Sequence, residues 1–205
     1  MNNCREMIKN NKPELTKQYV IDKWSGQYGM NNLYNSSLAE AEPHIGAIVL
    51  KYATGIICEV GCGNGRVANL FPHNRYIGID ISKKAITAAK ERLPGYQFEK
   101  IKYDADYPEA QTFLFYTVLV HVPDESIESV FTRVKKAGAK RIIIYEAMTR
   151  WFRQYSRHQN FHRDVCDYRG LAKQFGYNES HFYVVKSKSF PWFGNVLILD
   201  LIEKD

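Results

Sequence analysis

Three glycines at alternate positions, Gly61, Gly63 and Gly65, follow an apolar run that ends in the acid Glu59. Twenty-one residues after Glu59, a second apolar run ends in Asp80. Glycines let a turn adopt positive φ and bring its backbone close to a ligand. A carboxylate at the end of the next strand can accept hydrogen bonds from ribose hydroxyls. Together the two segments predict a site for an adenosine-containing ligand.

The spacing of the glycines indicates which ligand this is. A dinucleotide-binding turn has the pattern G-x-G-x-x-G, which lets a pyrophosphate rest on a helix N-terminus. Here the pattern is E-x-G-x-G-x-G, and Glu59 would place a negative charge beside the pyrophosphate. The sulfonium and ammonium groups of S-adenosylmethionine suit that carboxylate better, so a nicotinamide-dependent oxidoreductase is disfavoured. A tight turn without a ligand is the alternative, which the two acids make less favourable.

Three histidines, His121, His158 and His162, are candidates for a catalytic base. Methyl transfer is a displacement at an activated sulfonium carbon, so positioning supplies much of the rate. A base is needed only when the nucleophile must lose a proton early. Each histidine could instead pack in a loop or lie at the surface. No further His, Cys or acid joins them at ligand-like spacing, so no metal site is predicted.

A segment from 150 to 158 interleaves cations and aromatic side chains. It could stack on bases and neutralise phosphates, or hold a carboxylate or phosphate of a small molecule, because Arg pairs bidentately with both. A packed loop without a ligand is the alternative. The candidate substrate-binding residues are Arg150, Trp151, Arg153, Tyr155 and Arg157.

Length and composition are those of an ordinary globular domain: 205 residues, 45% hydrophobic and 24% charged. The net charge is +6, and residues 133–173 hold eleven Lys and Arg against three acids. This basic region could attract nucleic acid or an acidic small substrate, or be a solvated surface. The longest apolar run, 113–120, is too short to span a bilayer. Four cysteines without a CxxC pair favour reduced thiols and a cytoplasmic setting.

The elements that must position these residues alternate between apolar strands and amphipathic helices, which predicts an α/β fold with a doubly wound parallel sheet. Strands are expected over 56–60, 76–79, 96–103, 112–120 and 140–145, with an antiparallel pair over 182–186 and 195–202. Helices are expected to begin at 43, 66, 83, 123 and 164. We predict a single domain over 1–205, with a helical lid over 1–43, a cofactor-binding core over 55–146, and a substrate loop and C-terminal strands over 147–205.

Four segments, 59–65, 78–82, 103–105 and 117–124, together resemble the class I S-adenosylmethionine-dependent methyltransferases. The resemblance runs from about residue 55 to 146. It implies a Rossmann-like sheet of seven strands, mostly parallel with an antiparallel last strand, beneath an N-terminal helical cap. It also implies S-adenosyl-L-methionine as the cofactor and S-adenosyl-L-homocysteine as the product.

The resemblance assigns cofactor contacts to residues in each of these segments. The turn with Gly61, Cys62 and Gly63 would face the methionine part, and Glu59 would organise its amine. In the lid, the segment 24–29 resembles a cofactor cover. The remaining implied contacts are Trp24 and Tyr28 in the lid, Asp80 on the ribose, Ile81, Asp104 and Ala105 on the adenine, and Thr117 and Val118 on the methyl-transfer side.

Two departures from the family pattern affect the details. A second acid, Asp106, competes with Asp104 for the adenine, although position favours Asp104. The fourth strand is not followed by an N/D-P-P-Y/F sequence, whose absence argues against enzymes that methylate amines of nucleic-acid bases and glutamine.

The sequence therefore favours a methyltransferase that acts on an O or N atom of a small-molecule acceptor, with anionic acceptors among the candidates. An RNA or other nucleic-acid methyltransferase that uses the basic region 133–173 is the first alternative. A non-catalytic cofactor-binding interaction protein is the second. No membrane partner is expected, and the sequence names neither the acceptor nor the oligomeric state.

Overall fold

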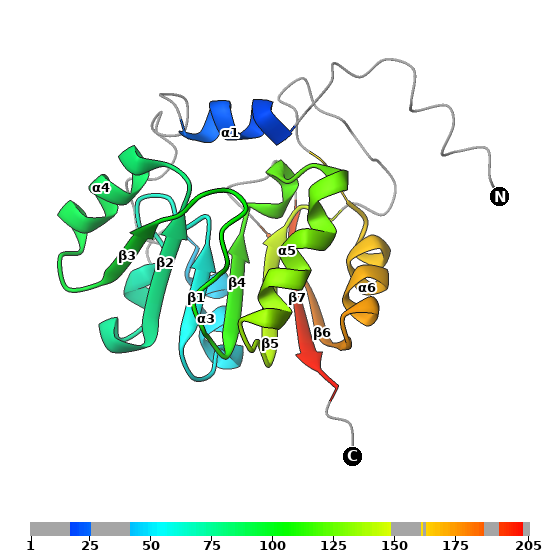
Figure 1. Cartoon of the computed structure of the whole chain (residues 1–205). Helices are drawn as coiled ribbons and strands as arrows, with labels where there is room; N and C mark the ends of the chain where they lie inside the picture. Colours follow the sequence, from blue (N-terminus) through cyan, green and yellow to red (C-terminus); the bar gives the residue numbers. More distant parts are fainter. Residues whose placement is uncertain (1–16, 26–41, 149–160, 162, 187–192, 203–205) are drawn as a thin grey trace.

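The computed structural model describes residues 17–25, 42–148, 161, 163–186 and 193–202 (Figure 1). In this part of the chain, seven strands form one sheet in the order β3-β2-β1-β4-β5-β7-β6. The first five strands pair in parallel, and β7 is antiparallel to both β5 and β6. The predicted doubly wound sheet with an antiparallel last strand is confirmed. The strands are β1 (Ile57–Val60), β2 (Tyr76–Asp80), β3 (Gln97–Lys100), β4 (Thr112–Tyr116), β5 (Arg141–Glu146), β6 (Tyr177–Lys186) and β7 (Phe193–Leu201).

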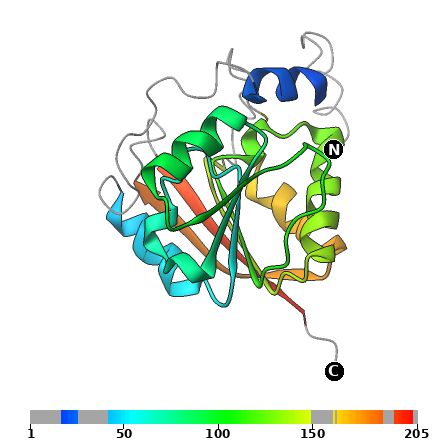
Figure 2. The ribbon, with the colours of Figure 1, turned by 60° about the vertical axis from the view of Figure 1, so that its left-hand side comes forward.

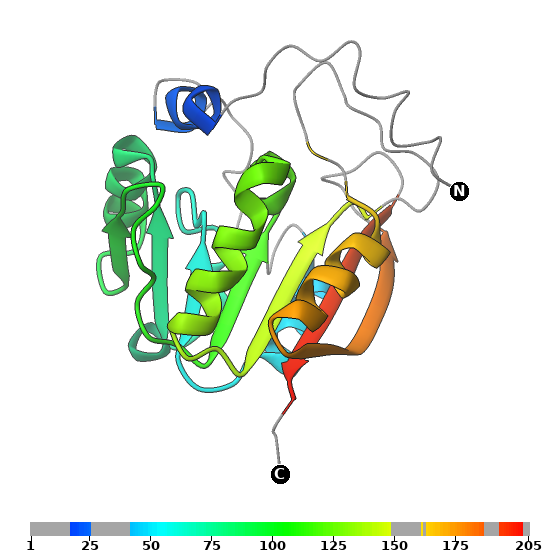
Figure 3. The same ribbon diagram turned by 45° about the vertical axis from the view of Figure 1, so that its right-hand side comes forward.

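Helices cover both faces of the sheet. One apolar core lies between the sheet and helices α5 and α6, which lie side by side in Figure 3. A second core lies on the opposite face, against α3 and α4. Helix α1 lies across the carboxyl ends of the parallel strands, as Figures 1 and 2 show. The helices are α1 (Lys17–Ser25), α3 (Pro43–Tyr52), α4 (Lys83–Arg92), α5 (Asp124–Lys136) and α6 (Val165–Gln174).

Local sequence signals explain where these helices begin. Pro43 is the first residue of α3, where its missing N–H costs nothing. The Ser82 hydroxyl accepts from the Ala85 amide and caps α4, as predicted. Asp164 and Asp167 form a reciprocal capping box at the start of α6. None of the described helices is both long and apolar enough to cross a membrane.

Several predicted boundaries were wrong. The helix expected after residue 66 is only a 3₁₀ turn, η3 (Ala68–Leu70), because the stretch between Gly65 and Pro72 is too short for a stable α-helix. A second 3₁₀ turn, η4 (His73–Arg75), precedes β2. The strands predicted over 96–103 and 182–186 are β3 and β6, the first shorter and the second longer than expected. Of the helical lid predicted over 1–43, only α1 and the start of α3 lie in described residues.

The central strand β4 also ends earlier than predicted. All five of its residues are buried, as expected for a strand covered on both faces. Thr117 then has a φ of 58°, the left-handed region that strands do not use. A 3₁₀ turn, η5 (Leu119–His121), follows. This break turns the chain across the carboxyl end of the sheet.

Candidate functional site

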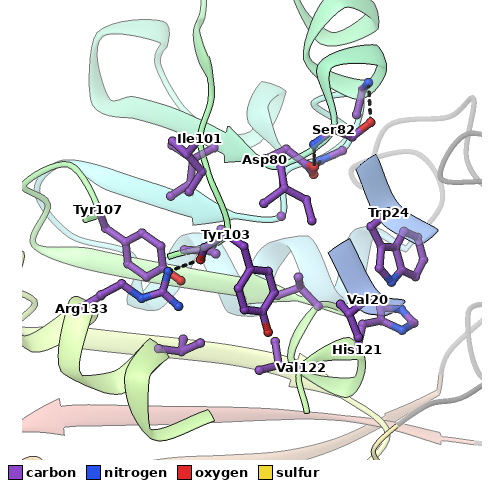
Figure 4. Close-up of a pocket in the computed structure, with 18 residues that line it drawn as sticks. Val20, Trp24, Asp80, Ser82, Ile101, Tyr103, Tyr107, His121, Val122 and Arg133 are labelled. Carbon is purple, nitrogen blue, oxygen red and sulfur yellow. Dashed lines mark hydrogen bonds between the residues drawn. The ribbon is translucent and has the colours of Figure 1, made fainter. Parts of the chain in front are cut away.

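A cavity of about 180 Å³ lies at the carboxyl ends of β1, β2 and β4, beneath α1 (Figure 4). One water needs only roughly 10–15 Å³ on such a measure, so the cavity has room for part of an organic ligand. Its walls come from the turn after β1, the end of β2, the segment after β4 and α1. Seven residues predicted from the sequence lie in this lining: Trp24, Gly61, Gly63, Asp80, Ile81, Val118 and His121.

The glycine turn forms the floor of the cavity, and each of its glycines has positive φ. A Cβ on Gly61 would lie 2.4 Å from the Val118 Cγ2 atom, so the backbone approaches that side chain too closely for any larger residue. A Cβ on Gly63 would meet nothing within 4 Å, which leaves open space over its backbone. The turn is fixed below by the Gly61 amide, which donates to the Ile79 carbonyl at 2.8 Å.

The Asp80 side chain connects the glycine turn to the start of α4. Its Oδ2 atom accepts from the Gly63 amide at 2.9 Å, and its Oδ1 atom accepts from the Ser82 amide at 2.8 Å. Burial raises the pKa of Asp80, and these backbone hydrogen bonds oppose that rise. A carboxylate offers about four acceptor positions, so this side chain can also accept hydroxyl donors from the cavity.

The roof comes from α1, through Val20 and Trp24 (Figure 4). The Trp24 ring contacts the His121 ring, with centroids 4.3 Å apart and planes tilted by 48°. Lys17, on the same helix, pairs with Asp104 at 2.5 Å, and both side chains are exposed. An exposed ion pair contributes little, so the aromatic contact is the stronger tie between α1 and the core.

Tyr107 and Arg133 form the end of the cavity away from α1, and Tyr103 lies between them and that helix (Figure 4). The Arg133 guanidinium donates to the Tyr103 carbonyl at 2.5 Å and lies over the Tyr107 ring, 4.6 Å from its centroid. Burial raises the pKa of the Tyr107 hydroxyl, which therefore stays neutral. This end of the cavity presents aromatic faces held by a fixed cation.

Residues 57–140 match a family model described as a methyltransferase domain. The matched region contains the glycine turn, Asp80 and the segment after β4. The chain carries a class I S-adenosylmethionine-dependent methyltransferase domain. No curated protein matches the chain in sequence.

Solved structures share the fold of this methyltransferase. Magnesium protoporphyrin IX methyltransferase from Synechocystis PCC 6803, with bound S-adenosylmethionine, superposes with a TM-score of 0.70 at 15% identity, over 94% of this chain and all of that one. An S-adenosylmethionine-dependent methyltransferase from Methanosarcina mazei gives 0.64 at 15% identity, over 77% of this chain and 98% of that one. An O-methyltransferase of neocarzinostatin biosynthesis gives 0.63 at 17% identity, over 80% of this chain and 55% of that one.

The methyltransferase's residues fit S-adenosylmethionine. The open backbone at Gly63 and the acceptor capacity of Asp80 match a ribose and a methionine part. Apolar side chains of Ile79, Ile101 and Val130 line the same cavity and suit an adenine ring. When bound, the cofactor supplies an activated methyl group on a sulfonium.

Glu59 and Cys62 do not line the described cavity. Side chains alternate along a strand, so Val60 faces the cavity and Glu59 faces the opposite side. There Glu59 is 2% exposed and accepts from the Tyr76 hydroxyl. Burial raises the pKa of Glu59 to about 8. The predicted contacts of Glu59 and Cys62 with the cofactor stay predictions.

The raised pKa of Glu59 predicts how the free energy of unfolding depends on pH. Because it is raised from 4.5 to about 8 in the folded protein, its stabilising effect is complete below pH 4.5 and is lost as the pH rises through about 8. Glu59→Gln should flatten the fall in unfolding free energy over that window, measured by urea titration. The exposed Glu99→Gln variant is the matched control. An equally steep fall in Glu59→Gln would contradict a neutral, buried Glu59.

Of the residues predicted to contact the adenine, Ile81 lines the cavity, but Asp104 and Ala105 do not. The Asp104 side chain is 62% exposed and pairs with Lys17. The Ala105 amide donates to the Lys102 carbonyl at 3.1 Å, and Asp106 pairs with Lys136 at the surface. The side chains of Asp104, Ala105 and Asp106 are not in the described cavity lining, so their adenine roles stay predictions.

Thr117 is likewise absent from that lining, and its amide donates to the Tyr145 carbonyl at 2.9 Å. The sequence interpretation missed Tyr103 and Tyr107, which flank the acids of this segment and line the cavity instead. The Y-D-A-D-Y pattern over 103–107 contains both tyrosines, but the sequence interpretation considered only its two acids as ligand contacts. It also missed Arg133, whose hydrogen-bond partner Tyr103 lies 30 residues earlier in the sequence.

Several predicted residues lie outside the described part of the chain, and their roles stay predictions. Among the described residues, no group of three or more His, Cys, Asp or Glu could hold a metal ion. Cys58, Cys62 and Cys166 are free thiols. The predicted site residues outside the described ranges are Tyr28, Arg150, Trp151, Arg153, Tyr155, Arg157, His158 and His162.

Proposed function

We propose that this methyltransferase transfers the methyl group of S-adenosylmethionine to an O or N atom of a small-molecule acceptor, with anionic acceptors among the candidates. The cavity carries the proposal, because the glycine turn, Asp80 and Trp24 converge on it. Asp80 would hold the ribose and Ile81 would pack on the adenine. Val118 and His121 would lie on the methyl-transfer side, with His121 as the described candidate for a base.

Two structural relatives support a small acceptor. One is a methyltransferase named for magnesium protoporphyrin IX, and it superposes on this chain over its whole length. The other is an O-methyltransferase whose structure contains S-adenosylhomocysteine and 1,4-dihydroxy-2-naphthoic acid. We also propose that 1–205 is a single domain, with a lid over 1–43, a cofactor-binding core over 55–146, and a substrate loop with C-terminal strands over 147–205.

The contacts of the basic region favour a small acceptor over nucleic acid. Eight of its eleven Lys and Arg residues are described, and five of these have hydrogen-bond or ion-pair partners within the chain. A cation that already pairs with the protein is less available to phosphates. The five are Arg133 on backbone carbonyls, Lys136 with Asp106, Arg141 with Asp200, Arg163 with Asp124 and Arg169 with Glu179.

An acceptor screen tests this function. Small phenols, hydroxy acids and amines, each with and without a carboxylate, are compared with RNA oligonucleotides at two salt concentrations. Release of S-adenosylhomocysteine is the measurement. We expect turnover with one or more of these small molecules and none with RNA. Methylation of RNA alone, weakening with salt, would favour the nucleic-acid alternative instead.

The arginines of the 150–158 segment carry a separate prediction. Arg153→Ala and Arg157→Ala should each raise the KM for the acceptor about 10- to 150-fold, because a charged hydrogen bond contributes roughly 1.5–3 kcal/mol. The affinity for S-adenosylhomocysteine should not change. Steady-state kinetics with the best acceptor from the screen and calorimetry with the product check both parts. An equal loss of acceptor and cofactor binding would mean that the segment has a structural role.

A further inference from the structure

A buried glutamate at the end of β5 holds the segment after β4. Glu146 is 2% exposed, and its Oε1 atom accepts from the Val120 amide at 2.9 Å. Its Oε2 atom accepts from the Tyr168 hydroxyl at 3.2 Å. Burial raises the pKa of Glu146 to about 7, and the charge of Arg163 and these hydrogen bonds oppose that rise. A buried carboxyl is costly unless hydrogen bonds satisfy it. One of the donors to Glu146 is the backbone amide of Val120, in the segment after β4 that forms part of the cavity wall.

Arg163 holds the same segment from the side of α6. It is 7% exposed, and its guanidinium donates to the Leu119 carbonyl at 2.8 Å and to the Val122 carbonyl at 2.7 Å. A further donor pairs with Asp124 at 2.8 Å. The planar fork of Arg can bind two carbonyls and a carboxylate at once, which the single ammonium of Lys cannot reproduce.

The segment held in this way forms part of the cavity. Val118, His121 and Val122 line it, and the His121 ring contacts Trp24 of α1. The segment begins with the left-handed φ of Thr117. That conformation costs a residue with a Cβ about 1–2 kcal/mol, so other contacts must maintain it. The hydrogen bonds that Glu146 accepts and Arg163 donates are such contacts.

We propose that Glu146 and Arg163 are positioning residues of this methyltransferase, which fix the segment 118–122 so that it completes the cofactor cavity and seats Trp24 on His121. Neither side chain is in the described cavity lining, so each acts through the backbone that it binds. The inference rests on the placement of the cofactor in this cavity, proposed above.

The contact between Trp24 and His121 provides a readout that needs no cofactor. Trp24, Trp151 and Trp192 are the tryptophans of the chain, so Trp151→Phe with Trp192→Phe leaves Trp24 as the sole reporter. In this background, Glu146→Ala and Arg163→Lys should shift the Trp24 emission to longer wavelength. They should also weaken S-adenosylhomocysteine binding about tenfold or more, as expected when charged hydrogen bonds are lost.

Two matched variants separate positioning from folding stability. Glu146→Gln keeps an oxygen that accepts from Val120, so its spectrum and affinity should stay close to those of the parent. Arg169→Lys alters an arginine of α6 that pairs with Glu179 at the surface, and it should change neither. A lower melting temperature in Glu146→Ala and Arg163→Lys, with unchanged Trp24 emission and unchanged affinity, would overturn the proposal. If the parent itself binds no S-adenosylhomocysteine, the cofactor placement fails, while the Trp24 spectra still test the positioning.

A measurement on the folded parent covers the case in which both variants fail to fold. Burial raises the pKa of Glu146 to about 7, so the Val120 amide resonance should titrate near that pH in NMR spectra. Arg163 and Tyr168 face the carboxyl, and His121 lies next to Val120 in sequence. The Glu146→Gln variant keeps Arg163, Tyr168 and His121, so a Val120 titration that persists in this variant would report His121. A Val120 amide that exchanges with solvent in the folded parent as fast as an exposed amide would have no acceptor in Glu146, and this result would overturn the proposal.

Discussion

We expect the Asp80→Ala variant to bind S-adenosylhomocysteine about 5- to 150-fold more weakly than the wild type, a loss of roughly 1–3 kcal/mol. The ribose hydroxyls would lose the Asp80 carboxylate as their acceptor. The Gly63 and Ser82 amides would lose their acceptor, so the glycine turn and the start of α4 would no longer be joined. Isothermal titration calorimetry of the folded variant measures the change.

Asp106→Ala is the matched control for this prediction. Asp106 is also an acid near the carboxyl edge of the sheet, but its side chain is 66% exposed and pairs with Lys136. Its removal should leave the affinity unchanged. If Asp80→Ala binds as tightly as the wild type, Asp80 does not hold the ribose. Asp104→Ala in the same series tests the adenine role that the sequence predicts for Asp104.

Substitutions in the glycine turn should separate folding from binding. Gly61→Ala would place a Cβ 2.4 Å from Val118 at a φ of 71°. Left-handed strain of about 1–2 kcal/mol and overpacking of about 1–3 kcal/mol should both lower the free energy of unfolding. Gly63→Ala has the strain without the clash, because nothing lies within 4 Å of its Cβ. We therefore expect Gly63→Ala to stay folded and to lose cofactor affinity.

Urea titration and calorimetry on the same preparations check this contrast. Gly95→Ala is the control, since its Cβ meets nothing within 4 Å and its φ is not in the left-handed region. It should change neither stability nor affinity. Equal destabilisation by Gly61→Ala and Gly63→Ala would contradict the packing described for the turn. Full cofactor affinity in Gly63→Ala would mean that the ligand does not approach that backbone.

The features that the sequence predicted well are those that local patterns encode. The strand ends at Val60 and Asp80, the glycine turn and the Ser82 cap each depend on a few adjacent residues. Glu59 shows the limit of this reasoning. Its position at a strand end was clear, but the side of the sheet that it faces depends on the pleat and on which core covers that side.

The residues that the sequence interpretation missed depend on contacts between distant segments. Arg163 reaches Leu119 across 44 residues, and Glu146 reaches Val120 across 26. In the sequence, Arg163 was only one cation of a basic region. In the fold it is buried on backbone carbonyls, a role that no local pattern indicates. The break of β4 at Thr117 was missed for a similar reason, because the apolar run continues through it.

A crystal structure of the chain with S-adenosylhomocysteine tests the central claim most directly, namely that the cavity beneath α1 is the cofactor site. We expect the ribose hydroxyls within hydrogen-bonding distance of the Asp80 carboxylate, the methionine part over the Gly61–Gly63 backbone, and Trp24 above the ligand. Product bound elsewhere, with Asp80 contacting only the Gly63 and Ser82 amides, would contradict the claim.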